Sequence, residues 1–278
     1  MVEVVEKNTV CKGEKMLEMQ NRKVVLVTGG SQGIGASIVR TLARKGYSVI
    51  LNYNKSEEAA KNIQLELQSS NINIEIYKAD VSKHIEVTKL INYCIEKYHR
   101  IDVLINNAGF GVFGNFHEID LEKEIQLINT NITALHILTK LFLQDMKKND
   151  RGYILNVASI AGFMPGPLMS TYYASKSYVT RLSQSIREEL RRAKSNVKIS
   201  ILCPGPVGTN FNNVANVKFN SKSLPSEYVA KYAVNKLLKN KFYIIPGFQI
   251  KILRAVTKII PDSIIGKFAY KVQERKYQ

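Results

Sequence analysis

Tyr172 and Lys176 are the pair of residues in this chain best suited by type and spacing to proton transfer. On a helix, positions i and i+4 lie one above the other on the same face, so the phenol and the ammonium would be neighbours. A free Tyr has a pKa of about 10, and a nearby positive charge favours the phenolate and lowers that value. One lysine supplies part of the roughly 4 kcal/mol that a three-unit shift requires, and a bound cationic ring or a helix terminus would supply the rest. The same spacing is also common on exposed helix surfaces, so the rest of the chain must decide between the two interpretations.

A glycine-rich turn near the start of the chain indicates a dinucleotide site. The apolar run at residues 24–27 is typical of a buried parallel strand, and it is followed by TGxxxGxG at 28–35 and a helical pattern over 36–45. Glycines in such a turn let backbone N–H groups approach a pyrophosphate, and the helix N-terminus favours its negative charge. Because the spacing differs from the general GxGxxG form, a plain glycine-rich turn is the alternative.

The end of the second predicted strand, residues 48–52, bears on the choice between NADP(H) and NAD(H). An acidic residue there would bind the ribose 2′-OH of NAD and repel a 2′-phosphate. The chain has Asn54 and Lys55 instead, with Ser31 and Gln32 in the glycine-rich turn. This polar, partly cationic set favours NADP(H), with NAD(H) as the alternative; the plainer interpretation is that Lys55 is an ordinary surface lysine.

Strand-like and helix-like segments alternate along the chain, which predicts an α/β fold: a Rossmann-type doubly wound parallel sheet of about seven strands with helices on both faces. The predicted strands cover residues 24–27, 48–52, 72–77, 102–105, 153–157, 197–202 and 242–245. The predicted helices cover residues 36–45, 56–70, 83–98, 120–147, 170–194 and 224–239. Small and amide residues after the fourth strand, at 106–109, suit the ligand crevice of such a sheet. The polar stretch 210–223 is a candidate mobile loop.

The order of these segments resembles the short-chain dehydrogenase/reductase family, in its compact single-domain branch. The resemblance covers about residues 21–247, and Ser159 precedes Tyr172 at the spacing of the family's pattern. The motifs that carry it are TGxxxGxG at 28–35, Asp80-Val81, NNAG at 106–109, Asn131, Ser159, YxxxK at 172–176 and PG at 204–205.

The resemblance implies a role for each matching residue. Tyr172 would be the general acid/base, Lys176 would hold the nicotinamide ribose and lower the phenol pKa, and Ser159 would stabilise the substrate oxygen. Asn131 would help to hold a water for proton relay, and we prefer it to Asn129 because of its spacing from Ser159 in the sequence. The alternative is that either Asn is only a helix-surface residue. The residues implied in cofactor binding are Gly29, Ser31, Gln32, Gly33, Ile34, Asn54, Lys55, Asp80, Val81, Asn107, Gly109, Tyr172, Lys176, Pro204, Val207 and Thr209.

The implied function is an NADP(H)-dependent oxidoreductase that interconverts a ketone and a secondary alcohol. We expect an apolar or lipid-like substrate, of the 3-oxoacyl or hydroxysteroid type, because apolar side chains flank the predicted crevice. These side chains are Phe110, Phe113, Phe163, Met164, Leu168 and Met169. The alternative interpretation is that they are ordinary core or subunit-contact residues. The other function class is a catalytically silent NAD(P)-binding scaffold or sensor. The complete set of proton-relay residues argues against it, because a binding module needs no such relay.

Charge and cysteine content limit the partners and the compartment. The 278 residues include 40 Lys and Arg against 23 Asp and Glu, a net charge of +17 that attracts anions or simply solvates the surface. No RNA- or DNA-binding motif accompanies that charge, so nucleic acid is not an expected partner. Cys11, Cys94 and Cys203 contain no CxxC, so neither zinc nor disulfides are indicated. With no secretory signal or spanning segment, we expect a cytoplasmic protein. We also expect a homodimer or homotetramer.

Three regions are predicted: a flexible N-terminal extension at 1–20, the NAD(P)-binding catalytic domain at 21–247 and a basic helical extension at 248–278. The last has seven Lys and Arg against two acids, and Pro261 divides it into two helical pieces. Three interpretations of this extension stay open. It is a lid over the substrate loop, a basic amphipathic element on a membrane surface, or an oligomer contact.

Overall fold

The computed structural model, which describes residues 22–70, 72, 74–211 and 223–274, contains a sheet of seven parallel strands in the order β3-β2-β1-β4-β5-β6-β9. The order reverses between β1 and β4, and this reversal opens a ligand crevice at the carboxyl ends of those two strands. The doubly wound sheet predicted from the sequence is therefore confirmed. The strands are β1 (Val24–Val27), β2 (Ser48–Tyr53), β3 (Ile74–Lys78), β4 (Val103–Asn106), β5 (Tyr153–Val157), β6 (Lys198–Leu202) and β9 (Tyr243–Ile244), with a separate pair, β7 (Val207–Gly208) and β8 (Leu224–Pro225).

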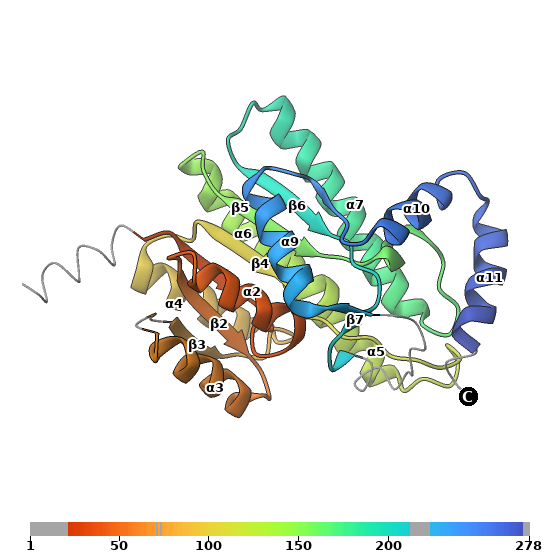
Figure 1. Ribbon diagram of the computed structural model, residues 1–278, viewed down its shortest axis with the longest axis horizontal. Coiled ribbons are helices and arrows are strands. Elements are labelled where there is room, and N and C mark those ends of the chain that lie inside the picture. Colours follow the sequence, from red (N-terminus) through yellow and green to blue (C-terminus); the bar gives the residue numbers. More distant parts are fainter. Residues whose placement is uncertain (1–21, 71, 73, 212–222, 275–278) are drawn as a thin grey trace, which may run out of the picture.

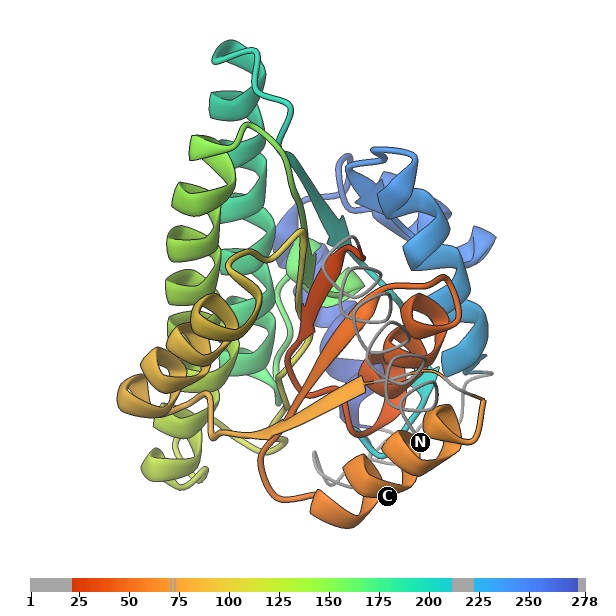
Figure 2. The same ribbon diagram turned by 90° about the vertical axis from the view of Figure 1, so that its left-hand side faces the viewer.

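Helices cover both faces of the sheet (Figures 1 and 2). One face carries α2 (Gly33–Ala43), α3 (Glu57–Gln68) and α9 (Ser226–Leu238), and the other carries α4 (His84–Tyr98), α6 (Leu135–Lys148) and α7 (Ser170–Arg192). Side chains of β1 alternate between the two cores, with Val25 and Val27 in the first and Val24 and Leu26 in the second. Because both faces are buried, the strand is continuously apolar rather than alternating.

The long helix predicted for residues 120–147 is interrupted in its middle. It consists of α5 (Leu121–Ile128), a π-helical segment η1 (Asn129–Ala134) and α6. A π-helical turn accommodates an extra residue within a helix and often lies at a functional site. Here it contains Asn131, which the sequence singled out. A shorter 3-10 helix, η2 (Ile160–Phe163), follows β5.

The C-terminal extension forms two helices, α10 (Phe248–Val256) and α11 (Asp262–Glu274), as the position of Pro261 predicted. Figure 1 shows both at one end of the molecule, with α11 at the outer edge. None of the helices in the described residues combines the length and the apolar content that crossing a bilayer requires. The predicted extension at 1–20 and most of the predicted loop at 210–223 lie outside the described residues.

The two C-terminal helices contact the body of the fold through a few specific side chains. Ile250 of α10 packs so closely on Gly205 that a Cβ at Gly205 would clash with it. The guanidinium of Arg254 lies 3.5 Å from the centre of the Tyr243 ring. Stacking of this kind, between a cation and an aromatic face, holds α10 against the edge strand β9.

Candidate active site

The predicted site residues line a single cavity of about 960 Å³ at the carboxyl edge of the sheet. Every residue implied in cofactor binding lines it, as does Ser159. Asn131 lies just behind the wall and is 1% exposed. The structure thus brings together residues that are far apart in the sequence, and it leaves none of the predicted set elsewhere.

The glycine-rich turn between β1 and α2 forms one end of the cavity. Gly29 and Gly33 have φ angles of +61° and +54°, in the left-handed region that favours glycine. A Cβ on Gly35 would clash with the carbonyl of Gly29, so α2 can begin against the turn only without a side chain there. The side-chain amide of Asn107 donates to the carbonyls of Thr28 and Gly29, each over 3.0 Å. This rigid turn and the free N–H groups of the helix start fit a pyrophosphate.

The carboxyl end of β2 forms the far side of this cradle. Asp80 is partly buried, which opposes ionisation, but hydrogen bonds from Ser82 and Asn54 outweigh burial and lower its pKa. Lys55 is exposed beside them and forms no ion pair with any residue that the structure describes. No acidic residue ends β2. The site therefore presents an unneutralised cation where a ribose phosphate would lie.

Ser159 and Tyr172 meet at the other end of the cavity. Ser159 ends the segment after β5 and caps η2, with its hydroxyl accepting from the backbone N–H of Ala161 over 3.2 Å. Tyr172 lies in the first turn of α7, and Ser159 acts on its hydroxyl. Burial raises the pKa of Tyr172 well above its usual value, and Ser159 opposes the rise only in part. The sequence predicted a lowered phenol pKa; in the protein chain alone, removal of the phenolate from water outweighs the nearby lysine.

Lys176 lies one helical turn after Tyr172, as its spacing predicted. Its Nζ donates to the carbonyl of Val157 over 2.9 Å and lies 5.7 Å from the centre of the Tyr172 ring. The side chain is 6% exposed. Burial lowers the pKa of the Lys176 amine to about 8, because the charged form loses its hydration. The amine is therefore close to its own titration at mildly alkaline pH.

Asn131 braces the floor of the site. Its Oδ1 accepts from the backbone N–H of Phe110 over 3.1 Å, and its Nδ2 donates to the Phe110 carbonyl over 2.9 Å and to the Ser175 hydroxyl over 3.1 Å. Ser175 in turn donates to the carbonyl of Tyr172 over 2.6 Å. A Cβ on Gly109 would lie 2.9 Å from Asn131 Oδ1, so a larger residue there would displace the Asn131 side chain. The geometry thus connects Asn131, and not the half-buried Asn129, to α7 through Ser175.

Comparison with known proteins identifies the family. A sequence model described as "short chain dehydrogenase" matches residues 23–218. The chain belongs to the short-chain dehydrogenase/reductase family. It is accordingly an oxidoreductase acting on CH–OH groups, as the sequence predicted.

Named relatives of this short-chain dehydrogenase include both an enzyme sequence and solved structures. The chain is 33% identical over 196 residues to the 3-oxoacyl-[acyl-carrier-protein] reductase of Synechocystis sp., covering 70% of this chain and 78% of the relative. A short-chain dehydrogenase from Sphingobium yanoikuyae in complex with NADPH superposes with a TM-score of 0.75 at 25% identity, covering 86% of this chain and 96% of that one. A short-chain dehydrogenase/reductase from Burkholderia phymatum in complex with NAD has a TM-score of 0.78 at 23% identity, covering 88% and 94%, and shares the fold.

The C-terminal helices of this short-chain dehydrogenase form one wall of the same cavity. The apolar side chains that line it from α10, α11 and the residues between them are Ile250, Leu253, Val256, Ile260, Ile264, Ile265, Phe268, Ala269 and Val272. Of the three interpretations that the sequence left open for this extension, a lid over the substrate loop is the one that places these helices at the site. The spacing of residues 260, 264, 268 and 272, four apart, is a further signal, because it predicts a single apolar face.

Of the six predicted crevice residues, four lie at the cavity or against its lining, and two, Phe163 and Leu168, do not line it. Phe110, Met164 and Met169 line the cavity, and Phe113 packs against Met169. Phe163 is different, because its ring packs against the core of the sheet. Sequence analysis also missed Tyr173 and Gln273, which line the cavity from α7 and α11. Tyr173 lies next to Tyr172 in the sequence, but nothing in the pattern distinguishes its role.

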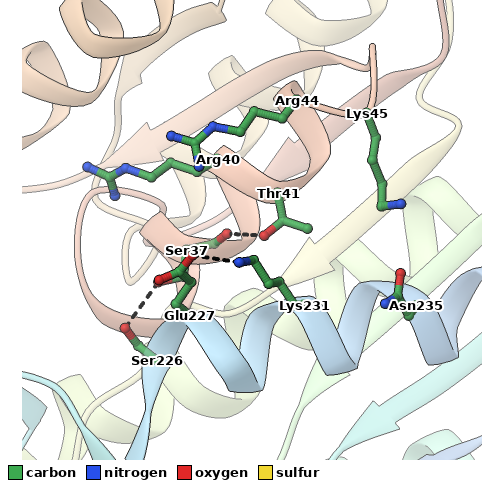
Figure 3. Close-up of a pocket in the computed structure, with 9 residues that line it drawn as sticks. All are labelled: Ser37, Arg40, Thr41, Arg44, Lys45, Ser226, Glu227, Lys231 and Asn235. Carbon is green, nitrogen blue, oxygen red and sulfur yellow. Dashed lines mark hydrogen bonds and ion pairs between the residues drawn. The ribbon is translucent and has the colours of Figure 1, made fainter.

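A second cavity, of about 710 Å³, lies between α2 and α9 and contains none of the predicted site residues (Figure 3). Its basic residues are largely paired. Arg40 and Arg44 bind Glu66 over 2.7 and 3.0 Å, and Lys231 binds Glu227 over 2.7 Å. Two carboxylates thus neutralise half of the charge of the four basic residues, and the cavity is separate from the site that contains Ser159 and Tyr172.

Proposed function

We propose that this short-chain dehydrogenase is an NADP(H)-dependent enzyme that interconverts a ketone and a secondary alcohol on an apolar, lipid-like substrate. The observation that carries the proposal is the position of Ser159 and Tyr172 together in the lining of the cavity. The pair lies between a glycine-rich cradle and an apolar wall of the same cavity. A carbonyl placed at the pair would have the cofactor on one side and an apolar environment on the other.

The residues of the chain act on the substrate oxygen. The nicotinamide cofactor supplies or accepts the hydride when it is bound. In the reducing direction the Ser159 hydroxyl donates to the oxygen as negative charge develops on it, and the Tyr172 hydroxyl gives it a proton. Because burial keeps the phenol protonated, the proton is available throughout the neutral range. In the oxidising direction Tyr172 must first become a phenolate, so this direction requires a further positive charge near the ring.

Lys176 and Asn131 support this proton transfer. The Lys176 amine, buried beside the Tyr172 ring, would hold the nicotinamide ribose and stabilise the phenolate that forms in the reaction. Asn131 would help to hold the relay water that returns a proton to the site. Its hydrogen bonds to Phe110 and Ser175 fix it in place for this purpose.

The preference for NADP(H) rests on charge at the end of β2. Lys55, with Asn54 beside it, would attract a 2′-phosphate, and the absence of an acid from β2 removes the repulsion that an NAD-specific site imposes. The structural neighbours were solved with either cofactor, NADPH in the Sphingobium protein and NAD in the Burkholderia protein. NAD(H) is the alternative, and the two cofactors must be compared directly.

The apolar substrate class rests on the environment of the Tyr172 ring. Tyr172 packs with Phe113, Tyr173 and Phe211 against Met169, and the ring centres of Tyr172 and Phe211 are 5.3 Å apart. The apolar faces of α10 and α11 extend this wall away from the proton donor. The name of the Synechocystis relative supports a 3-oxoacyl substrate, and a hydroxysteroid type is the second possibility within the class.

Turnover of a panel of ketones with NADPH and with NADH, side by side, tests the proposal. We expect lipid-like ketones to be reduced fastest, and the Tyr172→Phe variant to lose at least about 100-fold in kcat while still binding the cofactor. A preference for small hydrophilic sugars would refute the substrate class. Turnover of the variant at the wild-type rate would refute the role of Tyr172, and cofactor binding without turnover of any substrate would favour a silent binding protein.

A further inference from the structure

The C-terminal helices expose more large apolar side chains than their role as a cavity wall requires. Phe248, Ile259 and Phe268 are 76%, 84% and 72% exposed. Phe248, Ile252 and Val256 follow one another four residues apart along α10, so they share one face. Phe248 and Ile259 do not line the cavity. Exposed apolar groups this closely spaced mark a surface that binds something else.

Basic residues accompany these apolar groups. Lys251, Lys258, Lys267 and Lys271 are all exposed, and none forms an ion pair with a residue that the structure describes. Their only acidic neighbours within residues 248–274 are Asp262 and Glu274. An amphipathic helix with apolar residues on one side and lysines around them is typical of segments that lie in the surface of a bilayer.

The exposed surface is continuous with the cavity. Ile264, Phe268 and Val272, four apart on α11, line the cavity and are still 56%, 72% and 43% exposed. The mouth of the cavity is therefore apolar on this side. A polar rim would separate the cavity from apolar surroundings. At these three positions α11 has apolar side chains and no polar rim.

The charge of the chain selects the partner. A second copy of the chain would also have a net charge of +17, so pairing two such surfaces would bring like charges together. An anionic bilayer satisfies both features, since its head groups attract the lysines and its acyl region takes up the exposed apolar side chains. We propose that α10 and α11 form a docking surface that seats the mouth of the cavity on an anionic phospholipid membrane.

Docking of this kind gives a lipid-like substrate a direct path between the bilayer and the cavity, a consequence that rests on the proposed function. The docking itself does not depend on the reaction. It can therefore be measured without substrate or cofactor, and its failure would leave the proposed function intact.

Sedimentation of the full-length protein with vesicles tests the proposal. We compare phosphatidylcholine vesicles with vesicles of phosphatidylcholine and phosphatidylglycerol. The protein should bind the anionic vesicles, and binding should weaken as salt screens the charges. Phe248→Ser/Ile259→Ser should weaken binding at least about tenfold, because two apolar side chains no longer enter the bilayer. Lys258→Gln/Lys267→Gln should weaken it about 25-fold, at about fivefold for each lysine.

Matched control variants separate this surface from the general charge and hydrophobicity of the chain. Leu65→Ser/Ile85→Ser removes two side chains that are 63% and 70% exposed, on α3 and α4. Lys89→Gln/Lys140→Gln removes two exposed lysines on α4 and α6. Figure 1 shows α3 and α4 at the opposite end of the molecule from α11. Both controls should bind as the wild type does.

Three results would overturn the proposal. The first is the absence of binding to anionic vesicles at about 0.1 M salt, where the Debye length is about 10 Å. The second is equal loss of binding in the tail variants and the controls. The third is a change of oligomeric state in the tail variants, measured by sedimentation velocity, with vesicle binding unchanged, which would assign the surface to a second copy.

Discussion

The side-chain amide of Gln273, in the last helix, donates a hydrogen bond of 2.7 Å to the hydroxyl of Tyr173, the neighbour of the proposed proton donor. Gln273 is 2% exposed, and burial raises the pKa of the Tyr173 phenol while this bond lowers it. The bond joins residues 100 positions apart in the sequence. It fixes α11 against the start of α7 and thereby holds the apolar wall in place.

Gln273→Leu should therefore weaken substrate binding more than chemistry. The variant leaves the buried Tyr173 hydroxyl without this partner, at a cost of about 1–3 kcal/mol. We expect KM for a long-chain ketone to rise roughly 5- to 30-fold with kcat within about twofold, because the wall and not the proton donor is disturbed. Gln249→Leu, at an exposed position of α10, is the matched control. A fall in kcat at constant KM would contradict the role given to this bond.

Tyr172 should stay a neutral phenol well into the alkaline range. A pKa raised by burial means that the phenolate forms only above the usual value of about 10. The difference in phenolate absorbance between the wild type and Tyr172→Phe during alkaline titration measures this directly. Without cofactor, we expect no phenolate from Tyr172 below about pH 10. Its appearance near pH 8 would mean that the positive charge of Lys176 outweighs burial.

Lys176→Met should stabilise the protein near neutral pH, by an amount that depends on pH. The amine has a pKa of about 8 in the folded protein and near 10.5 ordinarily. Between these values the unfolded state binds the proton that the folded state has lost, so wild-type stability rises with pH there. Below pH 8 the buried charge of Lys176 lowers the free energy of unfolding of the wild type by roughly 3 kcal/mol. The variant is relieved of this cost, but it also loses the hydrogen bond to Val157, which was worth about 1 kcal/mol.

Denaturant unfolding at pH 7 and pH 10 checks this prediction. The stabilisation by Lys176→Met should be present at pH 7 and should shrink at pH 10. Lys140→Met, at an exposed lysine of α6, controls for the loss of a surface charge and should show no such trend. A stability difference independent of pH would mean that burial does not depress the lysine pKa.

Lys55→Glu should shift the cofactor preference. The carboxylate would repel a 2′-phosphate and could accept a hydrogen bond from a ribose hydroxyl. We expect KM for NADPH to rise roughly 10- to 100-fold, equivalent to about 1.4–2.8 kcal/mol, with a change of less than about threefold for NADH. Lys45→Glu, an exposed lysine of the separate cavity in Figure 3, makes the same charge change elsewhere. Equal weakening of both cofactors would show that Lys55 does not contact the 2′-phosphate.

Short-range signals made the sheet and the cradle predictable. The run at Val24–Val27 followed by Gly29, Gly33 and Gly35 defines a strand, a tight turn and a helix within a few residues. The spacing of Tyr172 and Lys176 placed them on one helix face. Each inference depends on contacts between neighbours in the chain, which local periodicity and residue type report well.

A lid over the substrate loop was one interpretation of the tail, but the contacts that build the apolar wall were not predictable, because they join distant segments. Spacing in the tail predicted helices, but it could not show that Gln273 meets Tyr173 or that Ile250 packs on Gly205. For Phe163 the local signal was misleading. Its position in the sequence, close to crevice residues, predicted a place in the crevice, but its ring packs against the core of the sheet.

The π-helical segment around Asn131 also limits which insertions and deletions the chain can accept between α5 and α6. Each residue of an α-helix turns the chain by about 100°, so an extra residue sets the faces of α5 and α6 out of phase. That offset lets Glu124 of α5 bond to Thr171 at the start of α7 while Phe142 of α6 packs against the sheet. Deleting one residue between 129 and 134 would rotate one of these helices away from its partner. A deletion in this segment would therefore disturb both helices, whereas a point substitution at an exposed position of the segment keeps the register.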